Sequence, residues 1–414
     1  MSHDRGCPCG KENYEYQDCQ KPDCFKKPQH STKTAVTYDA LVFIARAQPF
    51  HNGHKAVVDA ALEKAKEVII VVGSSFASRT IRNPFTFDER KSMIKAVFPQ
   101  ENVKVVPVSD YPYDDNKWVA AIQGVVYSAM KYTPDPIKIG LIGHEKDGTS
   151  YYLKIFPTWG NESVPNVDGI HATDIRKMLL EHDWAPGKMS ALMPASAYTT
   201  MADIFVANAE GGGAWDTLSK EYDMIHAYKK PYQKITDETL QQIVEDSFAD
   251  GQFDQSDLLC LLRSFDKEYR PQYAPTFMTT DAVVVQSGHI LLVKRKHAPG
   301  MGLWALPGGF LNPGEKMVDG ALRELREETK IKVPLPVLRG SIKDQKTFDD
   351  PYRSTRGRTI TQAFYIDLGF DKNLPKVKGS DDAEKARWVP FNEVDRTQMF
   401  EDHFFIIDNF LNIG

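Results

Sequence analysis

The chain has 414 residues, a hydrophobic share of 42%, a charged share of 26%, and a formal net charge of −5 from 51 basic and 56 acidic residues. This length exceeds what one hydrophobic core usually supports, so we expect more than one domain. The nearly balanced charge gives no electrostatic basis for non-specific nucleic-acid binding, and no apolar run approaches the length of a membrane span. We therefore expect a cytoplasmic protein that binds neither nucleic acid nor membranes, and the sequence leaves a homo-oligomer open.

Residues 1–35 are rich in cysteine, with Cys7, Cys9, Cys19 and Cys24 close together. In a reducing compartment such a cluster binds metal more often than it forms disulfides. The spacing resembles a small zinc-binding tail motif of bacterial proteins, although the usual closing Cys-Cys or Cys-His pair is absent. Two interpretations stay open, namely a structural Zn²⁺ held by the four cysteines, or a tail without a metal.

Apolar runs alternate with amphipathic segments through residues 36–205. Strand, helix and strand within about 35 residues make a parallel crossover unit, and the alternation then continues. In chain order we predict strands at 38–45, 67–72, 103–108 and 137–142, and helices at 57–66, 87–98 and 117–132. The pattern predicts a doubly wound, Rossmann-like α/β domain.

A glycine triplet at 211–213 indicates a hinge, and residues 206–274 are predicted to be a helical linker region of unassigned role. From residue 281 the run DAVVVQSGHILLVKR predicts two strands joined by a hairpin turn at Ser287–Gly288. Further strands are predicted at 358–368 and 386–389. Residues 275–414 are therefore predicted to form an α+β domain.

The segment GFLNPGEKMVDGALRELREETKI, residues 309–331, carries the first chemical motif. Its helical part places Glu324, Glu327 and Glu328 at positions i, i+3 and i+4, on one face of the helix. Like charges this close repel each other, and a cation removes the repulsion. Carboxylate oxygens suit Mg²⁺ or Mn²⁺, so we predict that these three glutamates bind the metal and serve the splitting of a diphosphate.

This segment resembles the box of the Nudix hydrolases, whose charged positions are matched by Glu315, Arg323 and the three glutamates. The departure is Lys330, which stands where the family has glycine. A left-handed helix end without glycine costs about 1 kcal/mol and leaves the carboxylates untouched. The resemblance implies hydrolysis of a nucleoside diphosphate derivative with Mg²⁺.

The second motif, RAQPFHNGH at residues 46–54, lies between the first predicted strand and helix. Backbone N–H groups at a helix N-terminus already favour an anion. Gly53 lets a phosphate approach the main chain, while His51 and His54 can donate hydrogen bonds to a phosphoryl group under attack. We assign both histidines to catalysis, and Arg46, Gln48 and Gly53 to substrate binding.

This segment resembles the signature of the nucleotidyltransferase superfamily that moves an adenylyl group from ATP to a phosphate acceptor, with Ala45 and Ala47 in place of glycine and phenylalanine. A second superfamily signature, a hydroxyl-bearing turn before Ile-Arg, is matched by GIHATDIR at 169–176. Here Thr173 is predicted to cap a helix and bind phosphate, and Arg176 to chelate the triphosphate.

Two further segments, RTIRNPFTFDER at 79–90 and YPYDDNKW at 111–118, resemble the nicotinamide mononucleotide (NMN) adenylyltransferases in particular. The resemblance implies direct in-line attack by the NMN phosphate on the ATP α-phosphorus, which gives NAD and pyrophosphate. It assigns Asn83 to the carboxamide and Trp118 to stacking on the nicotinamide ring, although Trp118 fits a packing role equally well. Nicotinate mononucleotide stays open as the alternative acceptor.

The carboxyl half holds a basic cluster of Arg353, Arg356 and Arg358, which can clamp a diphosphate. Nearby carboxylates offer a general base, for which we select Glu384 or Asp382. The half as a whole, including LWALPGGF, GSDDA and FEDHF, resembles the Nudix domain fused to NMN adenylyltransferases. Its usual substrate class is ADP-ribose.

The alternative from a different class is a Nudix domain that senses an NAD metabolite in a regulator. Such sensors tend to lose the metal carboxylates and gain a DNA-binding unit, whereas this chain keeps the glutamates and carries the acidic run EDSFADGQFDQSD at 245–257. A hydrolase that cut dinucleotides freely would undo NAD synthesis. We therefore predict that NAD itself is a poor substrate.

Overall fold

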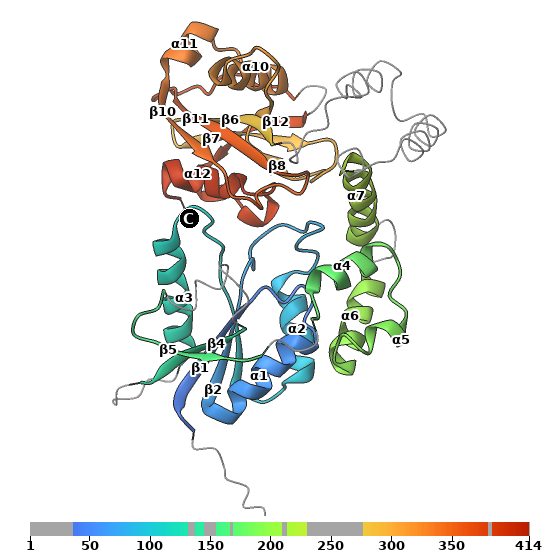
Figure 1. Ribbon diagram of the computed structural model, residues 1–414. Helices are drawn as coiled ribbons and strands as arrows, with labels where there is room; N and C mark the ends of the chain where they lie inside the picture. The colour runs from blue at the N-terminus through green and yellow to red at the C-terminus, as the bar shows by residue number, and fades with distance from the viewer. Residues whose placement is uncertain are drawn as a thin grey trace, which may run out of the picture.

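The computed structural model describes residues 36–130, 137–144, 155–165, 169–208, 213–229, 276–379 and 383–413. The cysteine cluster with its predicted zinc site, and residues 209–212 and 230–274 of the predicted linker, lie outside these ranges. Within them, no helix combines the length and the apolar character needed to cross a membrane. The described residues form a first unit, residues 36–229, and a second unit, residues 276–413 (Figure 1).

The first unit is built on a parallel five-stranded sheet in the order β3-β2-β1-β4-β5. Its strands are β1 (Tyr38–Ala45), β2 (Ala65–Val72), β3 (Val103–Pro107), β4 (Ile139–Gly143) and β5 (Gly160–Ser163). Its helices are α1 (Asn52–Lys64), α2 (Phe87–Val97), α3 (Asp115–Ala129), α4 (Ala172–Leu180), α5 (Pro186–Met189), α6 (Ala195–Ala207) and α7 (Ala214–Lys229). The predicted doubly wound fold is confirmed.

Strand β1 shows why the apolar run YDALVFIA becomes a central strand. Leu41 and Phe43 pack in the cluster beneath α1 and α2, whereas Ala40 and Val42 pack in the cluster that α3 covers. Side chains of a strand alternate between the two faces of the sheet, so a strand covered on both faces must be apolar throughout. The carboxyl ends of β1, β2 and β3 therefore carry the polar loops that can bind a ligand.

Helix α7 begins directly after the glycine triplet and packs on the first unit. Trp215 is 1% exposed, and its ring lies 5.0 Å from that of Phe85 and 4.9 Å from that of Phe205, measured between centroids. Farther along α7, Glu221 accepts a hydrogen bond from the backbone N–H of Gly300 in the second unit. This helix of the first unit therefore also contacts the second unit.

The second unit is built on a mixed sheet in the order β10-β11-β6-β7-β12, with β8 beside β7 and β9 beside β6. Its strands are β6 (Phe277–Gln286), β7 (His289–Arg295), β8 (Trp304–Ala305), β9 (Gly308–Phe310), β10 (Ile342–Phe348), β11 (Thr359–Asp367) and β12 (Ala383–Pro390), and its helices are α10 (Met317–Thr329), α11 (Leu335–Gly340) and α12 (His403–Leu411). The predicted hairpin is confirmed, because Ser287 and Gly288 join β6 to β7 with φ angles of 49° and 75°.

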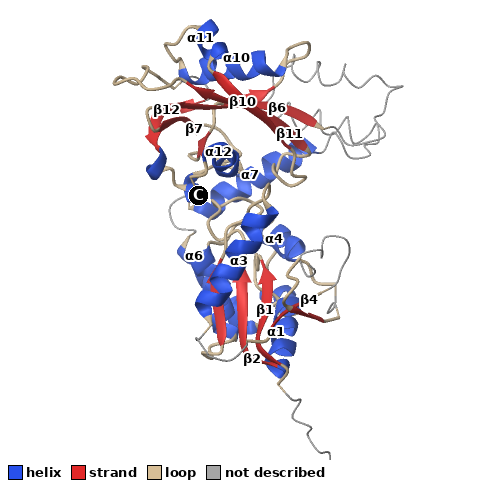
Figure 2. Ribbon diagram, turned by 90° about the vertical axis from the view of Figure 1, so that its left-hand side faces the viewer, coloured by secondary structure: helices blue, strands red, loops and turns tan. Residues whose placement is uncertain are grey.

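Helices cover both faces of this sheet. Leu322 and Leu325 of α10 pack on one face, and Phe404 and Ile407 of α12 pack on the other. Figure 2 shows α12 between the second sheet and the first unit. The second unit is therefore the expected α+β layered domain, and α12 forms part of the boundary between the units.

Candidate active sites

His51 and His54 lie together at the start of α1. Their ring centroids are 3.7 Å apart, and the backbone N–H of His51 donates to Nδ1 of His54 at 3.3 Å. A Cβ on Gly53 would lie 3.0 Å from Cε1 of His51, so glycine gives the imidazole its space. The structure thus places both predicted histidines at a helix N-terminus, where backbone N–H groups favour a phosphate.

The charges of Arg46, Arg82 and Arg176 interact, and Nη1 of Arg176 donates to the carbonyl of Gln48 in the loop before α1, while Nη1 of Arg82 donates to the Tyr352 carbonyl of the second unit at 2.5 Å. Burial, and then the charge of Arg46, lower the pKa of Arg82 to about 10. Burial, followed by the charges of Arg46 and Arg82, lowers the pKa of Arg176 to about 10 as well. Arg46 is exposed and Arg82 and Arg176 are half-buried, and cations that repel one another in this way fit a polyanion such as a triphosphate. Arg82 was missed by the motif reasoning, although it lies within the segment RTIRNPFTFDER.

Gln48 is held by the protein backbone. It is 1% exposed, its Nε2 donates to the Phe85 carbonyl at 2.8 Å, and its Oε1 accepts from the Phe85 N–H at 3.0 Å. Each end of the amide thereby makes a hydrogen bond, so Gln48 fixes the loop that carries Asn83. The contact of Gln48 with substrate stays a prediction.

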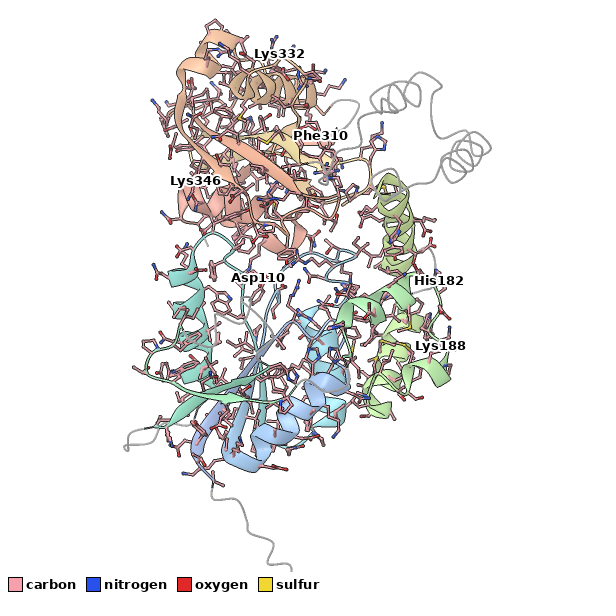
Figure 3. All side chains as sticks on the ribbon, viewed as in Figure 1. Asp110, His182, Lys188, Phe310, Lys332 and Lys346 are labelled. Carbon is pink, nitrogen blue, oxygen red and sulfur yellow. The ribbon has the colours of Figure 1, made fainter. Side chains whose placement is uncertain are left out.

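Arg90 is a second residue that the sequence reasoning missed. It is completely buried, and its guanidinium donates to the carbonyls of Arg46 at 2.6 Å and Gly73 at 2.7 Å. At the same end of the sheet, Asp110 accepts from the N–H of Ser74 at 3.0 Å and from its hydroxyl at 2.5 Å. Asp110 lies at the end of the first unit that faces the second (Figure 3). Arg90 and Asp110 therefore stabilise the loops that follow β1 and β2.

The second nucleotidyltransferase signature differs from its prediction in one detail. The N-cap of α4 is His171, whose backbone is extended, and Thr173 lies inside the first turn, so the prediction that Thr173 caps the helix is wrong. Its Oγ1 instead accepts from Nη2 of Arg176 at 3.1 Å, while Nη1 of Arg176 donates to the Gln48 carbonyl at 2.8 Å. Thr173 therefore orients the arginine of the anion site.

Asn83 and Trp118 have different surroundings. The side-chain Oδ1 of Asn83 is buried, and no described residue donates a hydrogen bond to it. Trp118, on α3, packs half-buried against the cluster on the far face of the sheet, with its ring centroid 6.3 Å from that of Phe156. The structure thus gives Trp118 the packing contacts of the alternative interpretation, and its contact with a ligand stays a prediction.

Arg323 organises the acidic motif of the second unit. It binds both carboxylate oxygens of Glu315, at 2.9 and 3.0 Å, and donates from Nη1 to Glu324 at 2.7 Å and to Glu327 at 3.1 Å. The predicted helix ends at Lys330, which adopts the left-handed conformation with φ 48° and ψ 30°. The helix exit is thus retained without glycine.

Glu324 and Glu328 lean against two glycines of β9. Oε2 of Glu328 accepts from the Gly308 N–H at 3.0 Å, and a Cβ on Gly309 would lie 2.5 Å from Oε1 of Glu324. Burial, and then repulsion by Glu324 among other groups, raises the pKa of Glu328 to about 8. Burial likewise raises the pKa of Glu324. Two half-buried carboxylates that repel each other form a place where a cation is favourable.

The metal prediction is therefore met in part. Among the described residues, no three His, Cys, Asp or Glu side chains converge as a ready set of metal ligands. The side chain of Glu327 is 58% exposed and binds Arg323. Magnesium usually takes only one or two protein carboxylates and completes its shell with water and substrate phosphates. Glu324 and Glu328 fit that pattern, and they would hold the metal.

A cavity beside these glutamates contains two of the three predicted arginines. Arg353 and Arg356 line it, together with Arg295, Glu328 and Glu401. Arg358 instead donates to the Asp349 carbonyl and does not line the cavity. The third arginine of the cavity is Arg295, which the sequence did not predict.

The side chain of Arg353 is buried and held by an ion pair. Its side chain is 3% exposed and binds both oxygens of Asp402, at 2.9 and 3.0 Å. Asp402 and the cavity residues Glu401 and His403 belong to the segment FEDHF, which offered the one sequence signal for them. Asp382 and the side chain of Glu384, predicted as general base, lie outside the described residues.

Comparison with known proteins agrees with both sites. The Cytidylyltransferase-like family matches residues 42–138, and the NUDIX domain family matches residues 276–410. The crystal structure of a bifunctional NMN adenylyltransferase/ADP ribose pyrophosphatase from Francisella tularensis covers 91% of this chain and 100% of its own, with a TM-score of 0.74 and 31% identity. The chain belongs to this bifunctional family. A second crystal structure of that enzyme, complexed with AMP and a Mn ion, has a TM-score of 0.73.

Curated relatives match each unit of the bifunctional enzyme separately. The nicotinamide/nicotinic acid mononucleotide adenylyltransferase of Acinetobacter baylyi is 39% identical over 148 residues, which are 35% of this chain and 77% of the relative. The ADP-ribose pyrophosphatase of Methanocaldococcus jannaschii is 31% identical over 145 residues, which are 35% of this chain and 78% of the relative. The chain is therefore an enzyme of both kinds.

Proposed function

We propose that the first unit transfers the adenylyl group of ATP to nicotinamide mononucleotide. A phosphate oxygen of the mononucleotide attacks the α-phosphorus, the bond to the bridging oxygen breaks, and pyrophosphate leaves. Arg46, Arg82 and Arg176 neutralise the triphosphate, and His51 and His54 donate to the oxygens on which charge develops. The observation that carries the proposal is the pair of histidines at the N-terminus of α1, with Arg176 bound to the Gln48 carbonyl of the preceding loop.

Asn83 favours the amide over the acid as acceptor. Its buried Oδ1 can accept a hydrogen bond from the NH₂ group of nicotinamide, whereas the carboxylate of nicotinate would place a second acceptor against it. We infer that nicotinamide mononucleotide is the better acceptor. The test is to incubate the protein with ATP, Mg²⁺ and each mononucleotide and to separate the products by chromatography. Equal or higher kcat/KM with nicotinate mononucleotide would contradict the assignment.

We propose that the second unit hydrolyses ADP-ribose to AMP and ribose 5-phosphate with Mg²⁺. Water adds to one phosphorus of the diphosphate, and the bridging bond breaks. Glu324 and Glu328 would hold the cation, which neutralises diphosphate charge, while Arg295, Arg353 and Arg356 line the same cavity as Glu328 and bind the anion. The carrying observation is the cavity in which buried carboxylates and arginines face each other. The NAD-metabolite sensor remains the second candidate, and it predicts binding of ADP-ribose without turnover.

The substrate preference of the second unit can be measured in one set of reactions. ADP-ribose, NAD and NADH are each incubated with the protein and Mg²⁺, and the nucleotides formed are resolved by chromatography. We expect AMP from ADP-ribose and slow cleavage of NAD, because a unit that cut NAD freely would undo the first reaction. Cleavage of NAD as fast as ADP-ribose would contradict this substrate assignment.

A further inference from the structure

The loop between β3 and α3 of the adenylyltransferase unit reaches into the Nudix unit. The hydroxyl of Tyr113 donates to Oδ2 of Asp402 at 2.5 Å, and the Tyr113 ring lies edge-on to Phe348, with 4.9 Å between centroids. Burial, and then the nearby Asp402 carboxylate, raises the pKa of the Tyr113 hydroxyl, so the phenol remains a hydrogen-bond donor. A residue of one unit therefore supplies a hydrogen bond inside the other.

The acceptor of that hydrogen bond is the partner of a cavity arginine. Oδ2 of Asp402 also accepts from Nε of Arg353 at 2.9 Å, and Oδ1 accepts from Nη2 at 3.0 Å. The side chains of Asp402 and Arg353 are 7% and 3% exposed, so little water is present to replace a lost contact. Tyr113, Asp402 and Arg353 thus form a buried chain of hydrogen bonds that ends at the wall of the Nudix cavity.

The two residues that flank Asp402 in the sequence also belong to the cavity. Asp402 stands between Glu401 and His403, which both line the same cavity, and it precedes α12. Glu401 has a left-handed backbone, with φ 44°, and its carboxylate accepts from the Thr355 N–H at 3.0 Å. A non-glycine residue in this conformation is held there by its surroundings. A shift of Asp402 would therefore move two further cavity residues.

From these contacts we propose that Tyr113 is a positioning residue for the Nudix reaction, because its hydroxyl orients Asp402 and, through it, Arg353 at the diphosphate cavity. The adenylyltransferase unit thereby completes the hydrolase site. The inference rests on the proposed hydrolysis of ADP-ribose. Without the hydroxyl, the Asp402 carboxylate is free to turn wholly toward Arg353 and draw the guanidinium away from the cavity.

Tyr113→Phe in the full-length chain removes one oxygen and keeps the ring against Phe348. We expect the KM for ADP-ribose to rise about tenfold, with kcat within about twofold, because the lost contact orients a group that grips the bound diphosphate. Partial unfolding would instead lower kcat through the fraction of active enzyme and leave KM unchanged. Tyr111→Phe is the matched control, since its ring lies against Phe405 at the same boundary, and both of its constants should stay within about twofold of wild type.

Asp402→Asn and the double variant test the route of the effect. If Tyr113 acts through Asp402, adding Tyr113→Phe to Asp402→Asn raises KM no further. An unchanged KM in Tyr113→Phe, a loss confined to kcat, or effects that multiply in the double variant would each overturn the inference. Wild-type protein that does not cleave ADP-ribose would overturn the proposed function and this inference together, whereas normal wild-type hydrolysis with an unaltered Tyr113→Phe enzyme would overturn the inference alone.

Discussion

Gly309→Ala is expected to disable the Nudix site by displacing one carboxylate. The new Cβ would lie 2.5 Å from Oε1 and 2.6 Å from the carboxyl carbon of Glu324. Gly309 is not among the glycines with positive φ, so alanine can adopt its backbone conformation. The strain of the substitution therefore falls on Glu324 and not on the chain.

The size of the displacement follows from the contact distance. An unstrained Cβ contact needs at least 3.4 Å, so the Glu324 oxygen must retreat from 2.5 Å by about 0.9 Å. Glu324 also accepts from Arg323 at 2.7 Å, and moving the carboxylate strains that bond. A misplacement of about 1 Å in a catalytic arrangement can cost roughly a hundredfold in rate. We expect a loss of this order in Mg²⁺-dependent hydrolysis of ADP-ribose.

The assay measures AMP formation from ADP-ribose by chromatography over a range of Mg²⁺ concentrations, and NAD formation in the same preparations. Gly340→Ala is the matched control, because a Cβ at Gly340 meets open space and its φ is not positive. Gly340→Ala should hydrolyse ADP-ribose like wild type. Hydrolysis by Gly309→Ala within about threefold of wild type would refute the assigned role of Glu324.

Two further predictions concern stability. Lys330→Gly should raise the free energy of unfolding by about 1 kcal/mol, because glycine adopts the left-handed helix end without strain. The melting temperature of the second unit should then rise by roughly 2–4 °C. No rise in the melting temperature would mean that Lys330 makes compensating contacts. Burial lowers the pKa of His403 from 6.5 to about 3, so as pH falls the unfolded chain takes up the proton first. The contribution of neutral His403 to the free energy of unfolding is present above about pH 6.5 and is lost as pH falls toward 3. The free energy of unfolding of His403→Gln, measured with urea, should therefore depend less on pH in this window than that of wild type. Parallel pH profiles of the two proteins would contradict the pKa shift of His403.

The regular elements could be read from the sequence because their signals are local. The strand at 38–45 was predicted with the bounds that β1 has, since an apolar run that is covered on both faces has no polar interruption. The left-handed end at Lys330 was also marked in advance by the position of a missing glycine. Segments with weak local patterns, such as β5 and α5, were not predicted, because only neighbours distant in the chain stabilise them.

The sequence predicted which residue types lie in the two sites, but it predicted the role of each residue less well. Gln48 looked like a ligand residue, yet its amide is used by the backbone of Phe85, 37 residues away. Arg353 looked like a freely mobile clamp, yet Asp402, 49 residues away, fixes its guanidinium at the cavity wall. Such pairings join distant parts of the chain and leave no local pattern, so sequence reasoning overestimates how many polar groups are available to substrate.

The chain is proposed to hold two separate sites, and a reciprocal pair of variants distinguishes them. Glu328→Gln keeps the size of the side chain but removes a carboxylate from the proposed cation site, and His54→Ala removes a donor from the phosphoryl site. We predict that Glu328→Gln abolishes ADP-ribose hydrolysis while NAD formation stays near wild type. His54→Ala should lower NAD formation by roughly a hundredfold or more and leave hydrolysis intact. Loss of both activities in correctly folded Glu328→Gln, or wild-type NAD formation by His54→Ala, would contradict the account.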